Sequence, residues 1–448
     1  MAALFLVGAA VGSAVNLFVD RLRMETPRKS PFNKPFERLM ARWFSRGGRA
    51  PGRSSRQAPS SWVPWLPILG WYARRQEKPL ADGSWRRPCF VEFLAGAAFA
   101  GLYFLEVGYW RLVPNLASHY HQPPVGNLTP FDLNLYWVVH LAYLSHVLLL
   151  TLLLAASLID LDEWIIPDAI TVPGTLAALL LATAIPTTLL YTGRVPFKEG
   201  EDKFVSLAAP SAWPSSLDQR AGLVLALACV WTGCFALLPR VLYLRRGVAT
   251  GLRLFARRIV RSGGWTLSVL ATGLAVTAVV VPVWFVGGVH WRALLTALVG
   301  MAVGGGVIWV VRIVCSTALR REAMGFGDVT LMAMIGAFLG WQASVLVFFV
   351  SPFFGLIPPL VALVGRDKVP AAMPFGPFLC LGAATVLLCW AQFWPWAEDV
   401  IRVANEVIGN GWIAAAYLVG TLVGTLALMV ALLLLIQGIK RRFGWEGA

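Results

Sequence analysis

Four aspartates at the edges of two apolar segments are the residues of this chain best suited to do chemistry. The first segment, residues 157–171 (SLIDLDEWIIPDAIT), follows a long apolar run, and the second, residues 322–336 (EAMGFGDVTLMAMIG), leads into one. The four acids are Asp160, Asp162, Asp168 and Asp328. Because an acid at the end of an apolar helix is costly to place, each is a functional candidate by default.

Asp160 and Asp328 could form the pair of carboxyl groups that hydrolysis of a peptide bond requires. One carboxylate must be ionised to activate water, while the other must be protonated to polarise the carbonyl group. Two like charges a few ångströms apart titrate in separate steps, so such a pair meets both requirements near neutral pH. Asp328 is expected to open a helix, whose N-terminal dipole favours a negative charge. It is therefore predicted to be the more readily ionised partner.

Other residues of the two segments are supporting candidates. They are Gly325, Gly327, Asp162, Asp168 and Glu322. The two glycines lack side chains, which permits unusual backbone dihedral angles and the close approach of a substrate strand. Asp168 follows a proline and precedes an apolar run, so it is expected to cap a helix N-terminus. Asp162 is expected to be a solvated loop residue.

The composition places these acids in a membrane protein. Of the 448 residues, 58% are hydrophobic and 14% are charged, whereas soluble domains average roughly half apolar and a quarter charged. Apolar runs of about 20 residues, long enough to cross a hydrocarbon core of roughly 30 Å, recur along nearly the whole chain. The sequence therefore predicts an all-α, polytopic transmembrane helix bundle and excludes a water-soluble globule.

About 11 spans are predicted, with a cytoplasmic loop after the first. The spans are residues 2–22, 90–112, 136–159, 169–191, 221–243, 265–288, 292–316, 329–349, 351–365, 374–395 and 411–437. The net charge of +15 is gathered in basic clusters between the spans, which in a membrane protein mark cytoplasmic loops rather than a nucleic-acid site. This pattern places the N-terminus outside, the C-terminus in the cytoplasm and both acidic segments at the cytoplasmic face.

Short motifs along the chain resemble the type IV prepilin peptidases, membrane aspartyl proteases named for a Gly-x-Gly-Asp motif. Gly12-Ser13 with Asn16 and Arg21 resembles the family's GSxxNxxxxRL. The other matches, in order, are residues 66–71 (LPILGW), Arg87 with Val91-Glu92, residues 159–168 (IDLDEWIIPD), 322–331 (EAMGFGDVTL) and 374–382 (PFGPFLCLG). The resemblance implies a bundle of about eight helices, with Asp160 and Asp328 as the catalytic pair.

The resemblance also implies substrates and a cofactor. Family members act at the cytoplasmic face of the bacterial inner membrane and cut prepilin or pseudopilin precursors after a glycine in a short basic leader. Many then methylate the new N-terminus with S-adenosylmethionine. Anionic membrane lipid is a further expected partner, because it attracts basic segments. Proteolysis itself requires no cofactor.

Three departures from the family pattern stand out. The first loop lacks the paired CxxC cysteines often found there, so no zinc site is expected and methylation is doubtful. Thr330 occupies a position where the family usually has lysine. The separation between the two motifs is longer than usual, which two added spans would explain.

The predicted spans and the added segment divide the chain into five regions. They are a first transmembrane helix (1–22), a basic cytoplasmic loop without the zinc cysteines (23–89), helices carrying the first aspartate (90–191), an insertion with two extra helices (192–290) and helices carrying the glycine motif (291–448).

Three other functions compete with this reading. A presenilin-type protease would pair the glycine motif with Tyr-Asp inside a helix and a later Pro-Ala-Leu, and this sequence has neither. A proton- or ion-coupled transporter would place its acids near the bilayer midplane, often in repeated halves. A catalytically inactive homologue would keep the motifs without the reaction.

Overall fold

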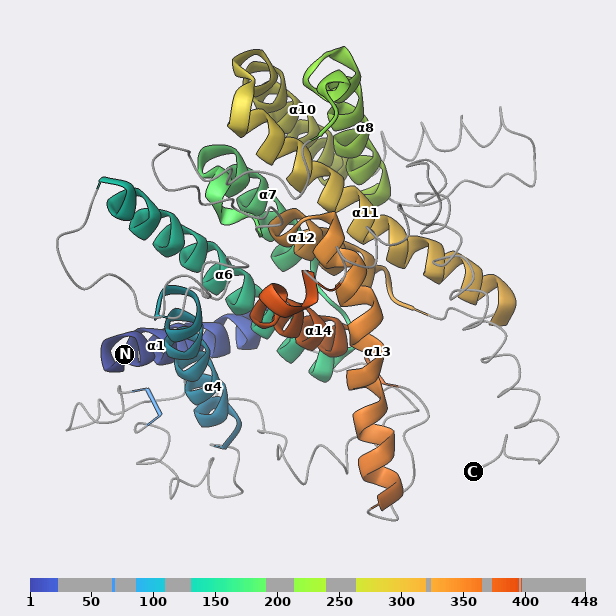
Figure 1. Ribbon diagram of the computed structural model, residues 1–448. Coiled ribbons are helices and arrows are strands. Elements are labelled where there is room, and N and C mark those ends of the chain that lie inside the picture. The colour runs from blue at the N-terminus through green and yellow to red at the C-terminus, as the bar shows by residue number, and fades with distance from the viewer. Residues whose placement is uncertain are drawn as a thin grey trace.

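The computed structural model describes residues 1–22, 67–68, 86–108, 130–190, 213–238, 263–319, 324–364, 373–394 and 396 (Figure 1). Its long helices are α1 (Ala2–Leu22), α4 (Arg86–Tyr103), α6 (Pro130–Glu163), α7 (Asp168–Ala184), α8 (Arg220–Leu237), α10 (Gly263–Val286), α11 (Gly288–Leu319), α12 (Phe326–Leu339), α13 (Trp341–Val364) and α14 (Gly376–Leu388). Three short helices are η2 (Phe104–Gly108), η3 (Pro186–Thr188) and η4 (Ser215–Asp218). No strand occurs among these residues. The predicted all-α class is confirmed.

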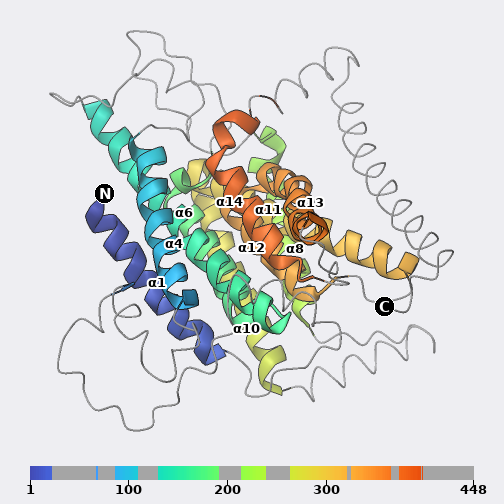
Figure 2. The same cartoon turned by 90° about the horizontal axis from the view of Figure 1, so that it is seen from below.

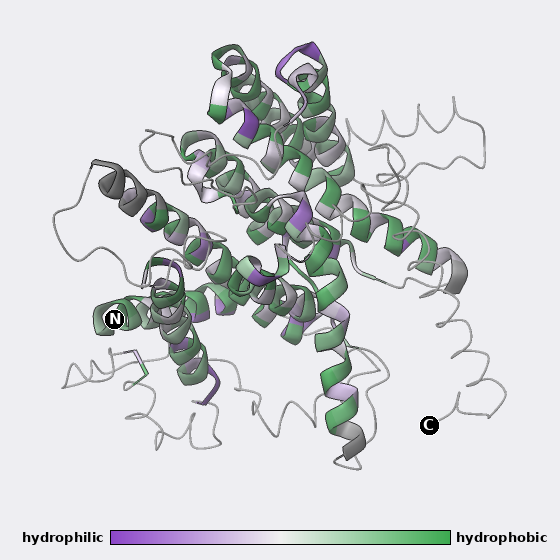
Figure 3. Cartoon of the chain, in the orientation of Figure 1, coloured by the Kyte–Doolittle hydropathy of each residue, from purple (hydrophilic) through white to green (hydrophobic). Residues whose placement is uncertain are grey.

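Most residues of the helices are hydrophobic (Figure 3). Within the described ranges, seven helices are long and apolar enough to cross a membrane: α1, α4 with η2, α6, α8, α10, α11 and α13. A chain with this many apolar helices is a multi-pass membrane protein, because only helices or closed barrels satisfy the backbone inside hydrocarbon.

Three predicted spans are shorter than expected. Helices α7, α12 and α14 contain 17, 14 and 13 residues, so each is shorter than the roughly 20 residues that a hydrocarbon core requires. The predicted end of span 329–349 is wrong, because α12 ends at Leu339 and a new helix begins after Gly340. This glycine has φ 88° and ψ 170°, a conformation that other residues rarely adopt. The predicted span 411–437 lies outside the described residues.

Helix α12 packs backbone to backbone against α11. A Cβ atom at Gly300 of α11 would overlap the carbonyl oxygen of Gly336, and one at Gly336 would overlap that of Gly300. Further along the same contact, Gly304 faces Met332, so the two helices run antiparallel. Small residues permit such close approach between membrane helices, and here they hold α12 against its neighbour.

The helices form two groups with separate cores. Helices α1, α4 and α6 lie side by side at one edge of the bundle, as Figures 1 and 2 show. Their buried side chains join those of α12, α13 and α14 in one core. Helices α8 and α10 lie at another edge (Figure 1) and pack with α11 and part of α7 in a second core. The two helices of segment 192–290 therefore contact the rest of the bundle through α7 and α11.

Candidate active site

Asp160 lies in the last turn of α6 and points at the start of another helix. The residue is 5% exposed, and its Oδ2 accepts a hydrogen bond of 3.1 Å from the backbone N–H of Gly376. Gly376 is the first residue of α14. The N-terminus of a helix carries a partial positive charge, so α14 stabilises the side chain of Asp160 from outside its own helix.

Asp328 lies in the first turn of α12 and is 7% exposed. Its carboxylate is hydrogen-bonded to the backbone of Gly325, the N-cap residue three positions earlier. The positive charge of Arg312, near the end of α11, also acts on it. The same guanidinium group lies 5.8 Å from the ring centre of Phe326. Asp328 thus faces the N-terminal N–H groups of its own helix, as the sequence predicted, and a nearby cation.

The two acids come from distant parts of the sequence to one place in the fold. Asp328 lies near enough to Asp160 for its charge to act on that carboxyl group, and the thiol of Cys380 lies near both acids. Ile166 lies between their segments. A Cβ atom added to Gly327 would be 2.8 Å from Ile166 Cβ, and one added to Gly376 would be 2.8 Å from Ile166 Cδ1. Both acids are therefore buried beside the turn that links α6 to α7.

The two motif glycines differ from their predicted role. Gly325 has φ −65° and ψ 158°, an ordinary extended conformation, and Gly327 lies within α12. No unusual dihedral angle requires a glycine at either position. The space beside Gly327 is filled by Ile166 of the same chain, not left open for a substrate. Gly327 therefore permits the α6–α7 turn to pack against α12.

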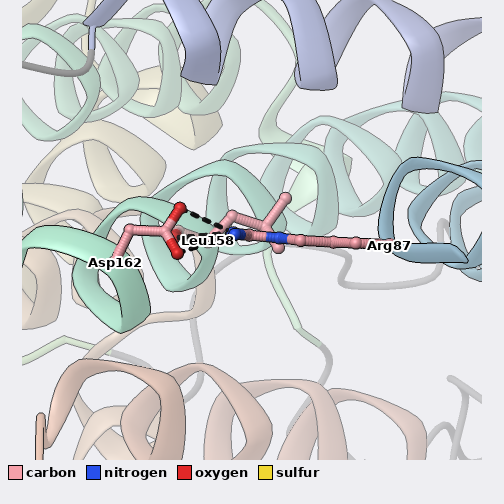
Figure 4. Close-up of polar contacts among 3 residues, drawn as sticks. All are labelled: Arg87, Leu158 and Asp162. Carbon is pink, nitrogen blue, oxygen red and sulfur yellow. Dashed lines mark hydrogen bonds and ion pairs between the residues drawn. The ribbon is translucent and has the colours of Figure 1, made fainter. Parts of the chain in front are cut away.

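Asp162 is part of α6 and is held in an ion pair, so its predicted place in a solvated loop is wrong. Arg87 Nη1 and Nη2 each lie 2.7 Å from one oxygen of Asp162, and Nη2 lies 3.3 Å from the carbonyl oxygen of Leu158 (Figure 4). The side chains are 17% and 23% exposed. Such a two-pronged contact has fixed geometry, and here it holds the turn of α6 that carries Asp160.

Asp168 does not cap a helix, because Pro167 occupies the N-cap position and makes no side-chain bond there. Asp168 is instead the first residue of α7, where the helix dipole favours its negative charge. Glu322 lies outside the described residues. Asp160 therefore lies at the C-terminal end of α6, and Asp168 and Asp328 lie at the N-terminal ends of α7 and α12.

The sequence analysis assigned no role to three residues that organise this region. Gly376 binds Asp160, Arg87 binds Asp162, and Glu92 is 1% exposed. The Glu92 carboxylate accepts hydrogen bonds from the Ser13 hydroxyl and from the backbone N–H of Ile68, the latter at 2.5 Å. Each of the three belongs to a motif that carried the family resemblance, and that membership was the available signal.

Arg87→Ala is expected to slow substrate turnover about tenfold by loosening the final turn of α6. It removes the two-pronged partner of a carboxylate that is only 23% exposed. Asp162→Ala removes that charge, so the double variant should lose less activity than the two single losses combined, with a coupling of about 1 kcal/mol. A double-mutant cycle on initial rates measures this value. Additive losses would show that the ion pair does not position the turn.

None of the described residues forms a group of three or more His, Cys, Asp or Glu side chains placed to hold a metal. Most of the loop 23–89 lies outside the described residues. The absence of zinc from that loop remains a prediction, which metal analysis of the purified protein would check.

The fold and the site together define a multi-pass membrane protein with two buried acids where helices end. Residues 263–360 match the model of the type IV leader peptidase family. The chain is 30% identical over 120 residues to a prepilin leader peptidase/N-methyltransferase of Pseudomonas putida, 34% over 107 residues to one of Aeromonas salmonicida and 29% over 99 residues to one of Escherichia coli. Part of the chain is thus similar to the type IV leader peptidases, and the predicted resemblance is confirmed.

These matches cover only part of each protein. They include 27%, 24% and 22% of this chain and 39%, 34% and 44% of the respective relatives. The family match contains Asp328 but not Asp160, and it begins with the first residue of α10. No solved structure gives a significant match.

Proposed function

We propose that this chain is an aspartyl endopeptidase that removes the leader peptides of prepilin-like or pseudopilin precursors. The observation that carries the proposal is that Asp160 and Asp328 are both buried around Ile166, at the ends of two apolar helices. Two buried carboxyl groups that share a site can divide the roles of base and acid between them.

Each acid has a role in this reaction. Asp328, beside Arg312 and the Gly325 backbone, acts as the base and takes a proton from the attacking water. Asp160, in its protonated form, donates a hydrogen bond to the carbonyl oxygen of the scissile peptide. The proton gained by the base then passes to the leaving amine. Gly376 and the α6–α7 turn hold both groups in place, and misplacement by about 1 Å could cost on the order of 100-fold in rate.

The position of the site favours a substrate that crosses the membrane boundary. An apolar substrate helix can remain in the bilayer while its leader extends into water, so the cut falls where the two meet. We place this boundary at the cytoplasmic face of the bacterial inner membrane, with the N-terminus outside and the C-terminus inside. A basic leader would bind anionic lipid beside the enzyme, at roughly 1 kcal/mol per Lys or Arg.

A transporter or an inactive homologue is the alternative. The two acids lie at helix ends, whereas transporter sites lie near the midplane in broken helices. An inactive homologue would keep the geometry and fail to cut.

The relatives' names add an N-methyltransferase activity, for which S-adenosylmethionine would be the methyl donor. Among the described residues, Glu92 and Glu106 are buried acids of the N-terminal region. Both oxygens of Glu92 are bonded within the chain, by Ser13 and Ile68, and Glu106 Oε1 is bonded by His146. We propose the peptidase activity alone.

The purified protein, reconstituted with a pilin-like precursor that has a basic leader ending in glycine, is expected to release that leader. Mass spectrometry of the product identifies the new N-terminus. A precursor that stays intact, or a cut at another peptide bond, would contradict the proposed specificity.

A further inference from the structure

An apolar cavity of about 150 Å³ lies behind the helix that carries Asp328. Its walls come from five helices, α7, α8, α10, α11 and α12. Helices α8 and α10, the two helices of segment 192–290, close one side, and α12 closes the other. The cavity therefore lies where these two helices meet the helix of the glycine motif.

The cavity is separate from the pair of aspartates. The residues that α12 contributes are Phe326, Val329, Thr330 and Ala333, whose spacing of three and four residues defines one helix face. Successive residues turn by about 100° around a helix. Asp328 accordingly lies roughly 150° from the middle of that face. One side of α12 presents the acid to α6, and the other borders the cavity.

The lining is unsuited to water or to a charged ligand. None of the described lining residues is charged. The hydroxyl groups of Thr175, Thr272 and Thr330 donate to carbonyl oxygens of their own helices, at 2.7, 2.8 and 3.1 Å. The buried Thr171 Oγ1, also in the lining, has no hydrogen-bond partner among the described residues, and a single hydroxyl is too few partners for a buried water. A buried water needs two to four polar partners, and an apolar cavity of about this size stays dry and binds small apolar molecules.

The surroundings identify the available apolar ligand. In their most apolar windows, α8 and α10 are only 28% and 17% buried inside the protein, so their remaining surface faces the hydrocarbon of the bilayer. Thr232 of α8 is exposed, and Gly306 and Trp309 of α11 are partly exposed, so the lining reaches that surface. The cavity is too small for a helix. It suits a segment of one hydrocarbon chain, whose entry would restore the dispersion contacts that an empty void loses.

We propose that this cavity binds an acyl chain of a membrane phospholipid, which packs against the back of the catalytic helix between it and α8 and α10. The bilayer supplies this ligand at high concentration, and the site selects it by shape and by the absence of charge.

Gly306 provides a direct test. A Cβ atom added there meets nothing within 4 Å, so the side chain of Gly306→Phe can enter the cavity without displacing a neighbour. Gly101 in α4 also has nothing within 4 Å of an added Cβ atom and lies outside the cavity. Gly101→Phe is therefore a matched control for the loss of a helical glycine.

The experiment uses full-length protein in vesicles of phosphatidylglycerol that carries a photoreactive group in one acyl chain. Peptide mapping should find labels on Met301, Trp309 or Val329 in the unmodified chain and in Gly101→Phe. In Gly306→Phe these labels should fall at least about fivefold, while labels on the outer face of α10 remain. Gly233→Leu, at another lining position with Met301 Cε 3.4 Å from an added Cβ, provides a second variant if Gly306→Phe does not fold.

Two results would overturn the proposal. One is labelling of the lining residues that does not fall in either filled variant. The other is that no lipid label is found on the lining of the unmodified chain. This result includes the case in which a pilin-like precursor, or residues 411–437 of this chain, cross-links there instead. Neither readout depends on peptidase activity.

Discussion

Asp160→Asn and Asp328→Asn should each abolish cleavage of a pilin-like precursor, with losses of about 10²-fold to 10⁴-fold. Asparagine has nearly the size of aspartate but can neither accept the proton from water nor donate one as a carboxylic acid. Both aspartates are buried, and each substitution removes one member of the pair. The measurement is the initial rate of leader release in reconstituted membranes.

The neighbouring acids serve as controls for the dyad. Asp162→Asn and Asp168→Asn change the same chemical group in the same region, and each should cost no more than about tenfold, because neither group touches the reacting atoms. All four variants should insert into membranes as the unmodified chain does. Near-normal processing by either dyad variant would show that the assignment of Asp160 and Asp328 is wrong.

Gly376→Ala is expected to reduce cleavage at least about 100-fold without preventing membrane insertion, since misplacement of a catalytic group by about 1 Å has effects of this size. A Cβ atom at this position would overlap Asp160 Oδ2 and would lie 2.8 Å from Ile166 Cδ1. The carboxylate must then move away from the backbone N–H that now lies 3.1 Å from it. Overpacking of this kind also costs about 1–3 kcal/mol of stability.

The control for this change is Gly101→Ala, in which the added methyl group meets nothing within 4 Å. Its cleavage rate and thermal midpoint in detergent should match those of the unmodified chain. If Gly376→Ala kept the full rate while the protein stayed folded, the contact between α14 and Asp160 would have no part in positioning the acid.

The membrane class of this protein could be predicted from the sequence because it depends on properties that add along the chain. Apolar runs long enough to span hydrocarbon need no knowledge of their neighbours. The acids could be singled out for the same reason, since an aspartate at the end of an apolar helix is unusual wherever the helix packs. The ordered motifs then linked Asp160 and Asp328 to one family before any contact between them was known.

The limits of local reasoning appear at Asp162 and at Gly327. Asp162 resembled a solvated residue because its partner, Arg87, is 75 positions away. Gly327 suggested space for a substrate, but the space is taken by Ile166 from another segment. The broken span at 340 has a similar origin, because apolar residues continue through the break and only Gly340 marks the turn between α12 and α13.

The tertiary structure decided how the acids are held. Asp160 depends on an N–H group of Gly376, 216 positions later in the chain, and the glycines of α11 and α12 permit the close contact that positions Asp328. Hydropathy specifies that a segment is buried but not which other segment it faces, because membrane helices associate through the fit of their surfaces rather than through a hydrophobic difference between them. The sequence by itself therefore determined the class of protein and its reactive groups, and helix packing determined the site that they form.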